Sequence, residues 1–418
     1  MLVNKERMLQ KMEEFNLDAI IASHPENVSY LGDFQSQIPY MYRFLYAESY
    51  ALFARRADIT PAMIIMAVDA VWPARFPTWI QEIYTFGNPN WDVDPQGNLT
   101  EGEKKFKEIL DAPGKNTPSA GEAIVKALKD KGLDRGTIGL DEKNVYPATR
   151  EQILKGLPHA KIIDAFELFR VIRMVKTKEE LERITTVGIK NERAVQSVLK
   201  RVAVGVSEEE LTQHFLECVA KEGAIFEFWN TASGTQSSMH IMSNGHFRPP
   251  SGYRLKKGDM FRYDGGCIYD RYHSDAGGCA ILGTPTQKHK GIYQAIDAGI
   301  ERGMELLRPG AIPSKIFEEA GKAVEKAGIK DYSKYATFCG HGIGIEARDY
   351  PIFTKPVKAS SPFFPGTLDV PIEEGMVISL EVPHTVLGLG GFQVEYTLLV
   401  KKDGCEKLYP HKRELVII

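Results

Sequence analysis

The alternation of apolar and polar residues divides the chain into two parts. In the first part, short apolar segments that fit buried strands alternate with segments whose apolar residues recur at helical spacing. Alternating strands and helices are typical of an α/β domain. The expected strands are 18–22, 63–68 and 137–140, and the expected helices lie near 1–15, 102–111 and 119–131.

The pattern changes near residue 170, where a long helix is expected to begin. Thr177 and Glu180 have the spacing of a capping box, in which each side chain accepts a hydrogen bond from the backbone N–H of the other residue. Apolar residues then recur along one face of the helix. We therefore predict a domain boundary there, with an α/β domain over residues 1–172 and a second domain over 173–418.

The second domain contains a weak internal repeat with an offset of 105 residues. The segment VAVGVSEEEL (202–211) resembles LRPGAIPSKIF (307–317), and each copy is expected to form two helices followed by strands. We predict that two similar halves pack together and that acidic residues meet at their seam. The matching positions are Gly205 and Gly310, Val219 and Val324, Lys221 and Lys326, and Gly223 and Gly328.

The stretch FRYDGGCIYDRYHSDAGG (261–278) is expected to form a β-hairpin centred on Tyr269–Asp270. In that register Asp264 lies directly opposite Asp275 on the same face, where the Cβ atoms are about 4.5–5.5 Å apart. Two carboxylates at this distance repel each other. Either one of them is protonated or a cation lies between them.

Three further polar residues stand in glycine-rich or apolar stretches. His341 lies between glycines, which leave the imidazole accessible, and Glu381 and Glu395 stand in apolar strands. Each of them alone is more often a solvated carboxylate or a hydrogen-bonded core histidine. Together with Asp264 and Asp275 they carry a formal charge of −4, which two divalent cations would neutralise. An oxygen-rich set with one imidazole suits Mn, Co, Fe or Zn.

Composition narrows the class of protein and its location. The net charge of −3, without a basic block, does not support nucleic-acid binding. The first residues lack the apolar core of a signal peptide, and no run approaches the roughly 18 apolar residues of a membrane span. The five cysteines include no CxxC pair, which fits reduced thiols. We therefore expect a cytoplasmic protein that binds neither nucleic acid nor membrane.

Several motifs of the second domain resemble those of the pita-bread metallopeptidase family, which includes methionine aminopeptidase, aminopeptidase P, prolidase and the non-peptidase creatinase. These motifs are DGG…SDAGG, GHGIGIE, EEGMVISLEVP and VEYTLLV. The segment SHPENVSYLGDF (23–34) and the junction RMVKTKEELERI also resemble prolidase-like members. This favours the prolidase, aminopeptidase P and creatinase branch. The resemblance implies an α+β pita-bread catalytic domain over 173–418, preceded by the smaller α/β domain, and a homodimer.

The resemblance also implies an activity and the residues that carry it. The chain is expected to be a dinuclear metal-dependent hydrolase, with manganese favoured, that cleaves the bond before proline in an Xaa-Pro dipeptide or longer peptide through a metal-bridging hydroxide. Glu381 would also carry a proton from water to the leaving amine. His240 would donate to the developing oxyanion. The implied metal ligands are Asp264, Asp275, His341, Glu381 and Glu395.

Arg348 departs from the family pattern. It stands seven residues after His341, where prolidase-like sequences usually have a second histidine. An arginine is always cationic and favours carboxylates. Arg348 is therefore expected either to clamp a substrate carboxylate, and so to act in catalysis, or to pair with Glu346 or Asp349.

Two other departures leave the substrate open. Gln393 stands where these peptidases usually have arginine, and the segment 242–253 is an insert. The first alternative is a non-peptidase member of the same fold that acts on a small amide or zwitterion, as dimethylsulfoniopropionate lyase or creatinase does. The second is a catalytically inactive binding module, against which the complete ligand set argues.

Overall fold

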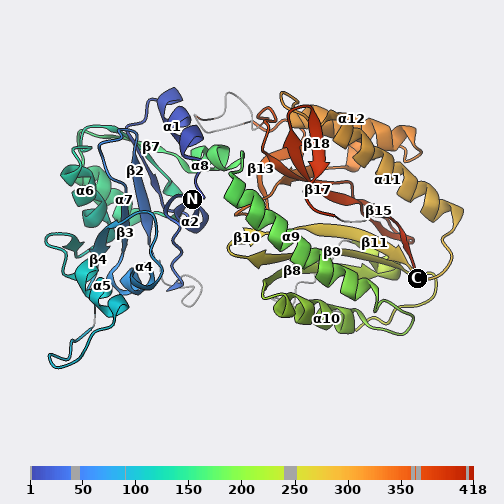
Figure 1. Cartoon of the computed structure of the whole chain (residues 1–418). Helices are drawn as coiled ribbons and strands as arrows, with labels where there is room; N and C mark the ends of the chain where they lie inside the picture. The colour runs from blue at the N-terminus through green and yellow to red at the C-terminus, as the bar shows by residue number, and fades with distance from the viewer. Residues whose placement is uncertain are drawn as a thin grey trace. The chain divides into compact units, whose positions relative to one another are not determined.

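The computed structural model describes residues 2–38, 48–89, 91–239, 252–358, 363, 369–410 and 414–418 (Figure 1). His240 and most of the insert 242–253 lie outside these residues. The chain divides into two compact units, Met1–Arg173 and Met174–Ile418. Within the described part of the chain, every helix is too short or too polar to cross a membrane.

The first unit is built on a mixed sheet with the strand order β5–β4–β3–β2–β1–β6–β7. β1 pairs antiparallel with β2 and parallel with β6. Helix α6 packs buried apolar residues against β3 and β4, and one hydrophobic core of this unit lies on that face of the sheet. The strands are β1 (Ala19–Ala22), β2 (Tyr50–Ala54), β3 (Ala62–Met66), β4 (Glu82–Phe86), β5 (Asn116–Thr117), β6 (Thr137–Leu140) and β7 (Lys161–Asp164).

The helices of the first unit begin at recognisable caps. Thr100 and Ser119 each accept a hydrogen bond from a backbone N–H in the first turn of α5 and α6. The helices are α1 (Lys5–Glu14), α2 (Pro25–Gly32), α4 (Val71–Arg75), α5 (Glu101–Leu110), α6 (Ala120–Asp130), α7 (Pro147–Gly156) and α8 (Phe166–Arg173), with 3₁₀ turns η1 (Ala67–Ala70) and η2 (Glu142–Asn144). The predicted elements of this part are therefore confirmed, with ends shifted by a few residues.

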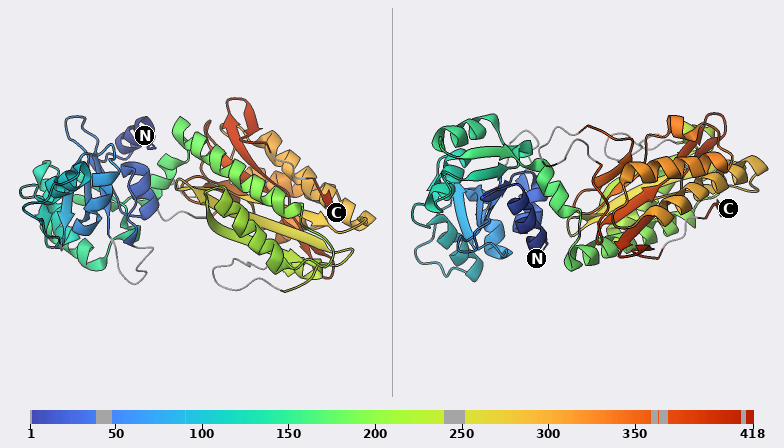
Figure 2. Two further views of the ribbon diagram at one scale, coloured as in Figure 1. Left: turned by 60° about the horizontal axis from the view of Figure 1, so that its bottom comes forward. Right: turned by 90° about the horizontal axis from the view of Figure 1, so that it is seen from above.

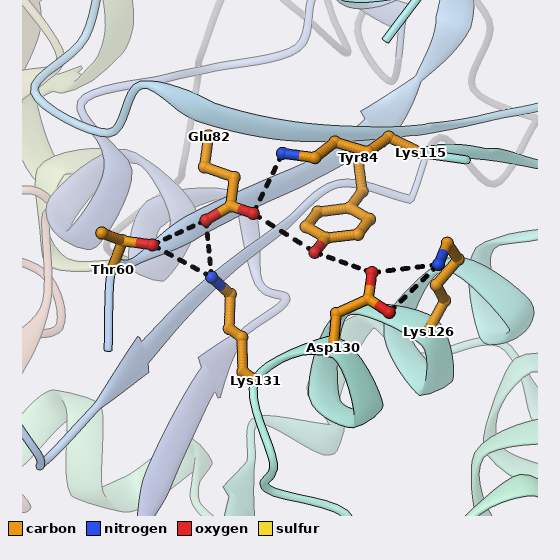
Figure 3. Close-up of polar contacts among 7 residues, drawn as sticks. All are labelled: Thr60, Glu82, Tyr84, Lys115, Lys126, Asp130 and Lys131. Atoms are coloured by element: carbon orange, nitrogen blue, oxygen red, sulfur yellow. Dashed lines mark hydrogen bonds and ion pairs between the residues drawn. The ribbon is translucent and has the colours of Figure 1, made fainter. Parts of the chain in front are cut away.

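A cluster of charged side chains ties the end of α6 to the sheet edge. The Glu82 carboxylate lies 3.0 Å from Lys115 Nζ and 2.6 Å from Lys131 Nζ. The Tyr84 hydroxyl lies 3.2 Å from Glu82 and 3.1 Å from Asp130. Figure 3 shows this cluster, which also includes Thr60 and Lys126. Hydrogen bonds from the two lysines and Thr60 outweigh partial burial and lower the pKa of Glu82 to about 2.

Replacing Glu82 by glutamine is expected to lower the free energy of unfolding of the first unit by about 1 kcal/mol at pH 7. The pKa of Glu82 is lower in the folded chain than in the unfolded one, so its charge stabilises the fold above the unfolded value of about 4.3. That stabilisation is lost as the pH falls towards 2. Denaturant unfolding of wild type and E82Q should therefore differ at pH 7 and converge in acid. Glu101→Gln, which removes an exposed pair with Lys104, is the control and should change little.

Among the described residues, the second unit contains two five-stranded sheets, each covered by a pair of helices, and a two-stranded sheet, β15–β16 (Figures 1 and 2). Helices α9 (Lys178–Leu199) and α10 (Glu208–Lys221) pack against the sheet β10–β9–β11–β19, in which β8 also pairs with β9. Helices α11 (Gln287–Leu306) and α12 (Pro313–Lys326) run side by side against the sheet β13–β12–β14–β17–β18. Helix α9 begins with the predicted capping box of Thr177 and Glu180.

The internal repeat is confirmed in the second helix of each pair. Helices α10 and α12 begin and end 105 residues apart. Gly205 and Gly310, at the turns before these helices, have φ angles of 90° and 83°, in the left-handed region that favours glycine. The same backbone turn therefore precedes both helices.

The remaining elements of the second unit are mostly strands. They are β8 (Ile225–Ser233), η3 (Gly234–Met239), β9 (Met260–Tyr269), β10 (Tyr272–His273), β11 (Ala276–Ile281), α13 (Tyr332–Tyr335), β12 (Phe338–Gly342), β13 (Asp349–Thr354), β14 (Val377–Glu381), β15 (His384–Val386), β16 (Gly390–Phe392), β17 (Glu395–Lys401), β18 (Gly404–Lys407) and β19 (Val416–Ile417).

Candidate metal centre

The five predicted metal ligands come from both sheets of the second unit. Asp264 lies in β9 and Asp275 directly precedes β11, while the other three lie in β12, at the end of β14 and at the start of β17. All five side chains are buried, none more than 6% exposed. Acidic side chains are almost never this deeply buried without a partner. The set is Asp264, Asp275, His341, Glu381 and Glu395.

The predicted register of the hairpin is wrong by two residues. Asp264 pairs with Gly277 rather than with Asp275. The turn is formed by Asp270 and Arg271, whose φ angles of 47° and 69° fit a type I′ turn that matches the twist of the strands. Successive side chains alternate between faces, so a shift of two residues keeps both aspartates on the same face. They are diagonal neighbours instead of opposed ones.

The carboxylates nevertheless converge. Glu381 and Glu395 lie directly opposite each other on β14 and β17. One oxygen from each of Asp264, Asp275 and Glu395 lies within 4.8 Å of the others. A cation could therefore contact all three carboxylates at once.

Four atoms that face this cluster have no hydrogen-bond partner among the described residues. They are Asp264 Oδ1, Asp275 Oδ1, His341 Nε2 and Glu381 Oε1. An unpaired buried polar group costs roughly 1–3 kcal/mol, and more when it is charged. Four such atoms at one place are difficult to explain in a stable core but are expected of ligand atoms. The residues therefore fit a metal centre.

The tautomer of His341 supports the same conclusion. Its Nδ1 lies 2.9 Å from the carbonyl oxygen of Gly342, which only accepts hydrogen bonds, so Nδ1 carries the proton. Burial, reinforced by the charge of Arg348, lowers the pKa of His341 to about 4, and the ring is neutral at pH 7. The Nε2 lone pair then lies 3.3 Å from Asp275 and 3.6 Å from Glu381. Such lone pairs repel unless a proton or a cation lies between them.

Burial raises the pKa of both Asp275 and Glu381 well above the ordinary range, and repulsion from the neighbouring carboxylates adds to this effect. Without a cation, these groups therefore retain protons at higher pH than ordinary carboxyl groups do. A metal ion has to displace those protons, so its binding is expected to tighten as the pH rises.

This linkage predicts how pH changes the stability of the metal-free protein. Asp275 and Glu381 hold protons in the folded chain at pH values where the unfolded chain has released them, so the free energy of unfolding falls as the pH rises above about 5. Bound metal removes that penalty. Thermal melts should therefore show a larger rise in Tm on adding Mn²⁺ at pH 8 than at pH 6. An equal rise at both values, or none, would contradict the assignment.

Hydrogen bonds from neighbouring side chains hold the Glu381 and Glu395 carboxylates. Gln393 Nε2 lies 3.2 Å from Glu395 Oε2 and 3.4 Å from Glu381 Oε2, and the Ser379 hydroxyl donates to Glu395 Oε1. Arg262 in turn donates to Gln393. Sequence reasoning missed Arg262, although it precedes Asp264 by two residues, the same spacing that separates Gln393 from Glu395.

The carboxylates open on a cavity of about 590 Å³. Asp264, Glu381 and Arg262 form its inner wall. Arg348, which is exposed, lines it as well and stacks on the Phe338 ring at 5.2 Å. Aromatic and imidazole side chains also line it, among them Tyr332, Tyr335 and His384. The space is large enough for a small organic substrate.

The environment of Arg348 bears on its two predicted roles. Asp349, one of the proposed ion-pair partners, is fully buried and lies 4.0 Å from the buried Lys176. Arg348 itself is close enough to Glu381 and His341 for its charge to affect the pKa of both. Arg348 therefore lies at the cavity, and both of its predicted roles stay predictions.

Comparison with known proteins gives a consistent result. Residues 182–402, more than half of the chain, match the profile of metallopeptidase family M24. An Xaa-Pro dipeptidase of Pyrococcus furiosus is 27% identical over 253 residues, which cover 60% of this chain and 67% of that protein. An ectoine hydrolase of Halomonas elongata is 24% identical over 300 residues, 69% of this chain and 72% of that protein.

The fold has close counterparts among solved structures. The crystal structure of an X-Pro aminopeptidase from Thermotoga maritima superposes with a TM-score of 0.72 at 20% sequence identity, covering 98% of this chain and 100% of that one. The predicted fold, an α+β pita-bread domain preceded by a smaller α/β domain, is thereby confirmed.

Proposed function

The chain belongs to metallopeptidase family M24, and from that premise we propose that it cleaves the bond before proline in small Xaa-Pro peptides. The observation that carries this proposal is the burial of five potential ligands at one place, where three carboxylates converge and four of the five side chains each present an atom without a hydrogen-bond partner in the described chain. The proposed ligands of two divalent ions are Asp264, Asp275, His341, Glu381 and Glu395.

The bound ions would polarise the scissile carbonyl and make water acidic enough to attack it near neutral pH. The other roles belong to the protein. Glu381 both faces the cluster and lines the cavity, so its carboxylate can take a proton from the attacking water and deliver it to the leaving amine. The proposed oxyanion donor, His240, lies outside the described residues and stays a prediction.

Arg348 is proposed to bind the carboxylate of the substrate. Its guanidinium lies over the Phe338 ring and lines the cavity, and a guanidinium can donate two hydrogen bonds to one carboxylate. A free carboxylate directly after proline identifies a dipeptide. The pocket therefore favours dipeptidase over aminopeptidase activity.

A panel of substrates tests this assignment. Wild-type protein with Mn²⁺ should release proline from Ala-Pro faster than it cleaves Ala-Pro-amide. Arg348→Ala should raise KM for Ala-Pro by about 10- to 100-fold, since one charge-assisted contact contributes about 1.5–3 kcal/mol. It should leave the amide nearly unaffected. An equal effect on both substrates would contradict carboxylate binding, and no cleavage by folded, metal-loaded protein would reject the peptidase.

A second candidate is a non-peptide hydrolase of the same fold. The similarity to an ectoine hydrolase over 69% of the chain favours it, and a cationic cavity could also hold a small zwitterion. Adding ectoine and small amides to the substrate panel distinguishes the two functions. The same five ligands would serve in either case.

Manganese as the metal, a homodimer and a cytoplasmic location stay predictions. So does the assignment of residues 1–172 to the smaller domain and 173–418 to the catalytic one. Metal analysis of the purified protein tests manganese, and its mass in solution tests the homodimer. The activity of the isolated second domain tests the domain assignment.

A further inference from the structure

One buried cation faces the carboxylate cluster from the cavity wall. Arg262 lies two residues before Asp264 on β9, and therefore on the same face of the strand. Its side chain is 4% exposed. Burial of a guanidinium is costly unless its charge is compensated. Here the charges of Asp264, Glu381 and Glu395 all favour the charged guanidinium.

Arg262 reaches the carboxylates through Gln393. Its Nε and Nη2 donate to Gln393 Oε1 over 2.9 Å and 2.6 Å. Both donors take the amide oxygen, so the amide nitrogen of Gln393 must face the other way. That nitrogen donates to Glu395 Oε2 and Glu381 Oε2. The amide of Gln393 thus links Arg262 to two proposed metal ligands, Glu381 and Glu395.

Two glycines leave room for this arrangement. A Cβ atom on Gly277 would lie 2.1 Å from Gln393 Nε2 and 2.3 Å from Glu395 Oε2. A Cβ atom on Gly391 would lie 2.9 Å from Arg262 Cδ. Side chains larger than hydrogen at either position would displace the pair.

We propose that Arg262 and Gln393 form a positioning pair that orients the Glu381 and Glu395 carboxylates. The proposal rests on the metal centre proposed above. Neither residue is assigned to touch the substrate. The side chains of Arg262 and Gln393 contact each other directly. An arginine at either position should therefore orient the two carboxylates equally well.

An exchange of the two side chains tests this proposal. Three proteins are compared: wild type, Arg262→Met, which keeps the length but loses the charge, and the double variant R262Q/Q393R. Mn²⁺ affinity is measured by isothermal titration, and the geometry of the ligands by the visible absorption of Co²⁺-loaded protein. Near-ultraviolet circular dichroism reports folding.

Arg262→Met should weaken Mn²⁺ binding by about 10- to 100-fold, the usual effect of removing a partner of a metal ligand, and should alter the Co²⁺ spectrum. The exchanged double variant should recover wild-type affinity within about threefold, together with the wild-type spectrum. A purely structural role for Arg262 would not predict that recovery.

Wild-type Mn²⁺ affinity and an unchanged spectrum in Arg262→Met would overturn the positioning role. Failure of the exchanged variant to fold or to bind Mn²⁺ like the wild type would overturn it as well. If wild-type protein itself binds no divalent ion, the metal centre is wrong, and that result is separate from failure of the exchange.

Discussion

Asp275→Asn is expected to reduce kcat/KM by at least about 1,000-fold and to abolish the binding of at least one metal ion. The change keeps the shape of the side chain but removes a buried negative charge from the centre of the cluster, where Asp275 Oδ1 lacks a partner within the described chain. The Lewis acidity of a bound metal ion contributes several kcal/mol to catalysis, which corresponds to this factor. Metal content and turnover should therefore fall together.

Asp270→Asn is the matched control for this variant. Asp270 lies in the turn of the same hairpin, outside the cavity lining, where it pairs with Arg183 at 3.1 Å. Asparagine tolerates its positive φ angle. The control should keep full metal content and activity. If Asp275→Asn retained turnover, the metallohydrolase assignment would be wrong; if the wild type bound a partner protein but hydrolysed nothing, the binding-module alternative would be favoured.

Gly277→Ala is expected to reduce kcat/KM by about 100-fold, although it adds a single methyl group. Its Cβ atom would collide with Gln393 Nε2 and Glu395 Oε2, both of which are fixed by hydrogen bonds. A displacement of about 1 Å in a reacting site can cost that factor. Steady-state kinetics with Ala-Pro and titration with Mn²⁺ measure the two effects.

The corresponding control is Gly291→Ala in helix α11. A Cβ atom there meets nothing within 4 Å, and alanine is the better helix former. This variant should match the wild type in activity and equal or exceed it in stability. Full activity in Gly277→Ala would show that the carboxylates tolerate movement, against the arrangement described.

The gathering of the five predicted ligands at one buried place could be anticipated from the sequence for a simple physical reason. Carboxylates in apolar strands, such as Glu381 and Glu395, have to be paired or bound to metal. The hairpin shows the limit of such reasoning. Counting outward from Tyr269–Asp270 gave the wrong register, because the pattern of side chains does not distinguish shifts of two residues. The backbone of the turn does, through the left-handed φ angles of Asp270 and Arg271.

Arg262 could not have been assigned from its own strand. An arginine two residues before an aspartate is unremarkable in sequence, and its partner Gln393 lies 131 residues away. Only the packing of the two sheets brings them together. The sequence shows that Gln393 replaces the usual arginine. It does not show that Arg262, on strand β9, places a guanidinium beside Gln393.

The most direct test of the account is a titration of the metal-free protein with Mn²⁺ in which bound metal and proline release from Ala-Pro are followed together. Two ions should bind per chain, and activity should reach its plateau as the second site fills. A chelator should abolish the activity. Proline release that is unaffected by removal of metal, or folded protein that binds no Mn²⁺, would contradict the central claim.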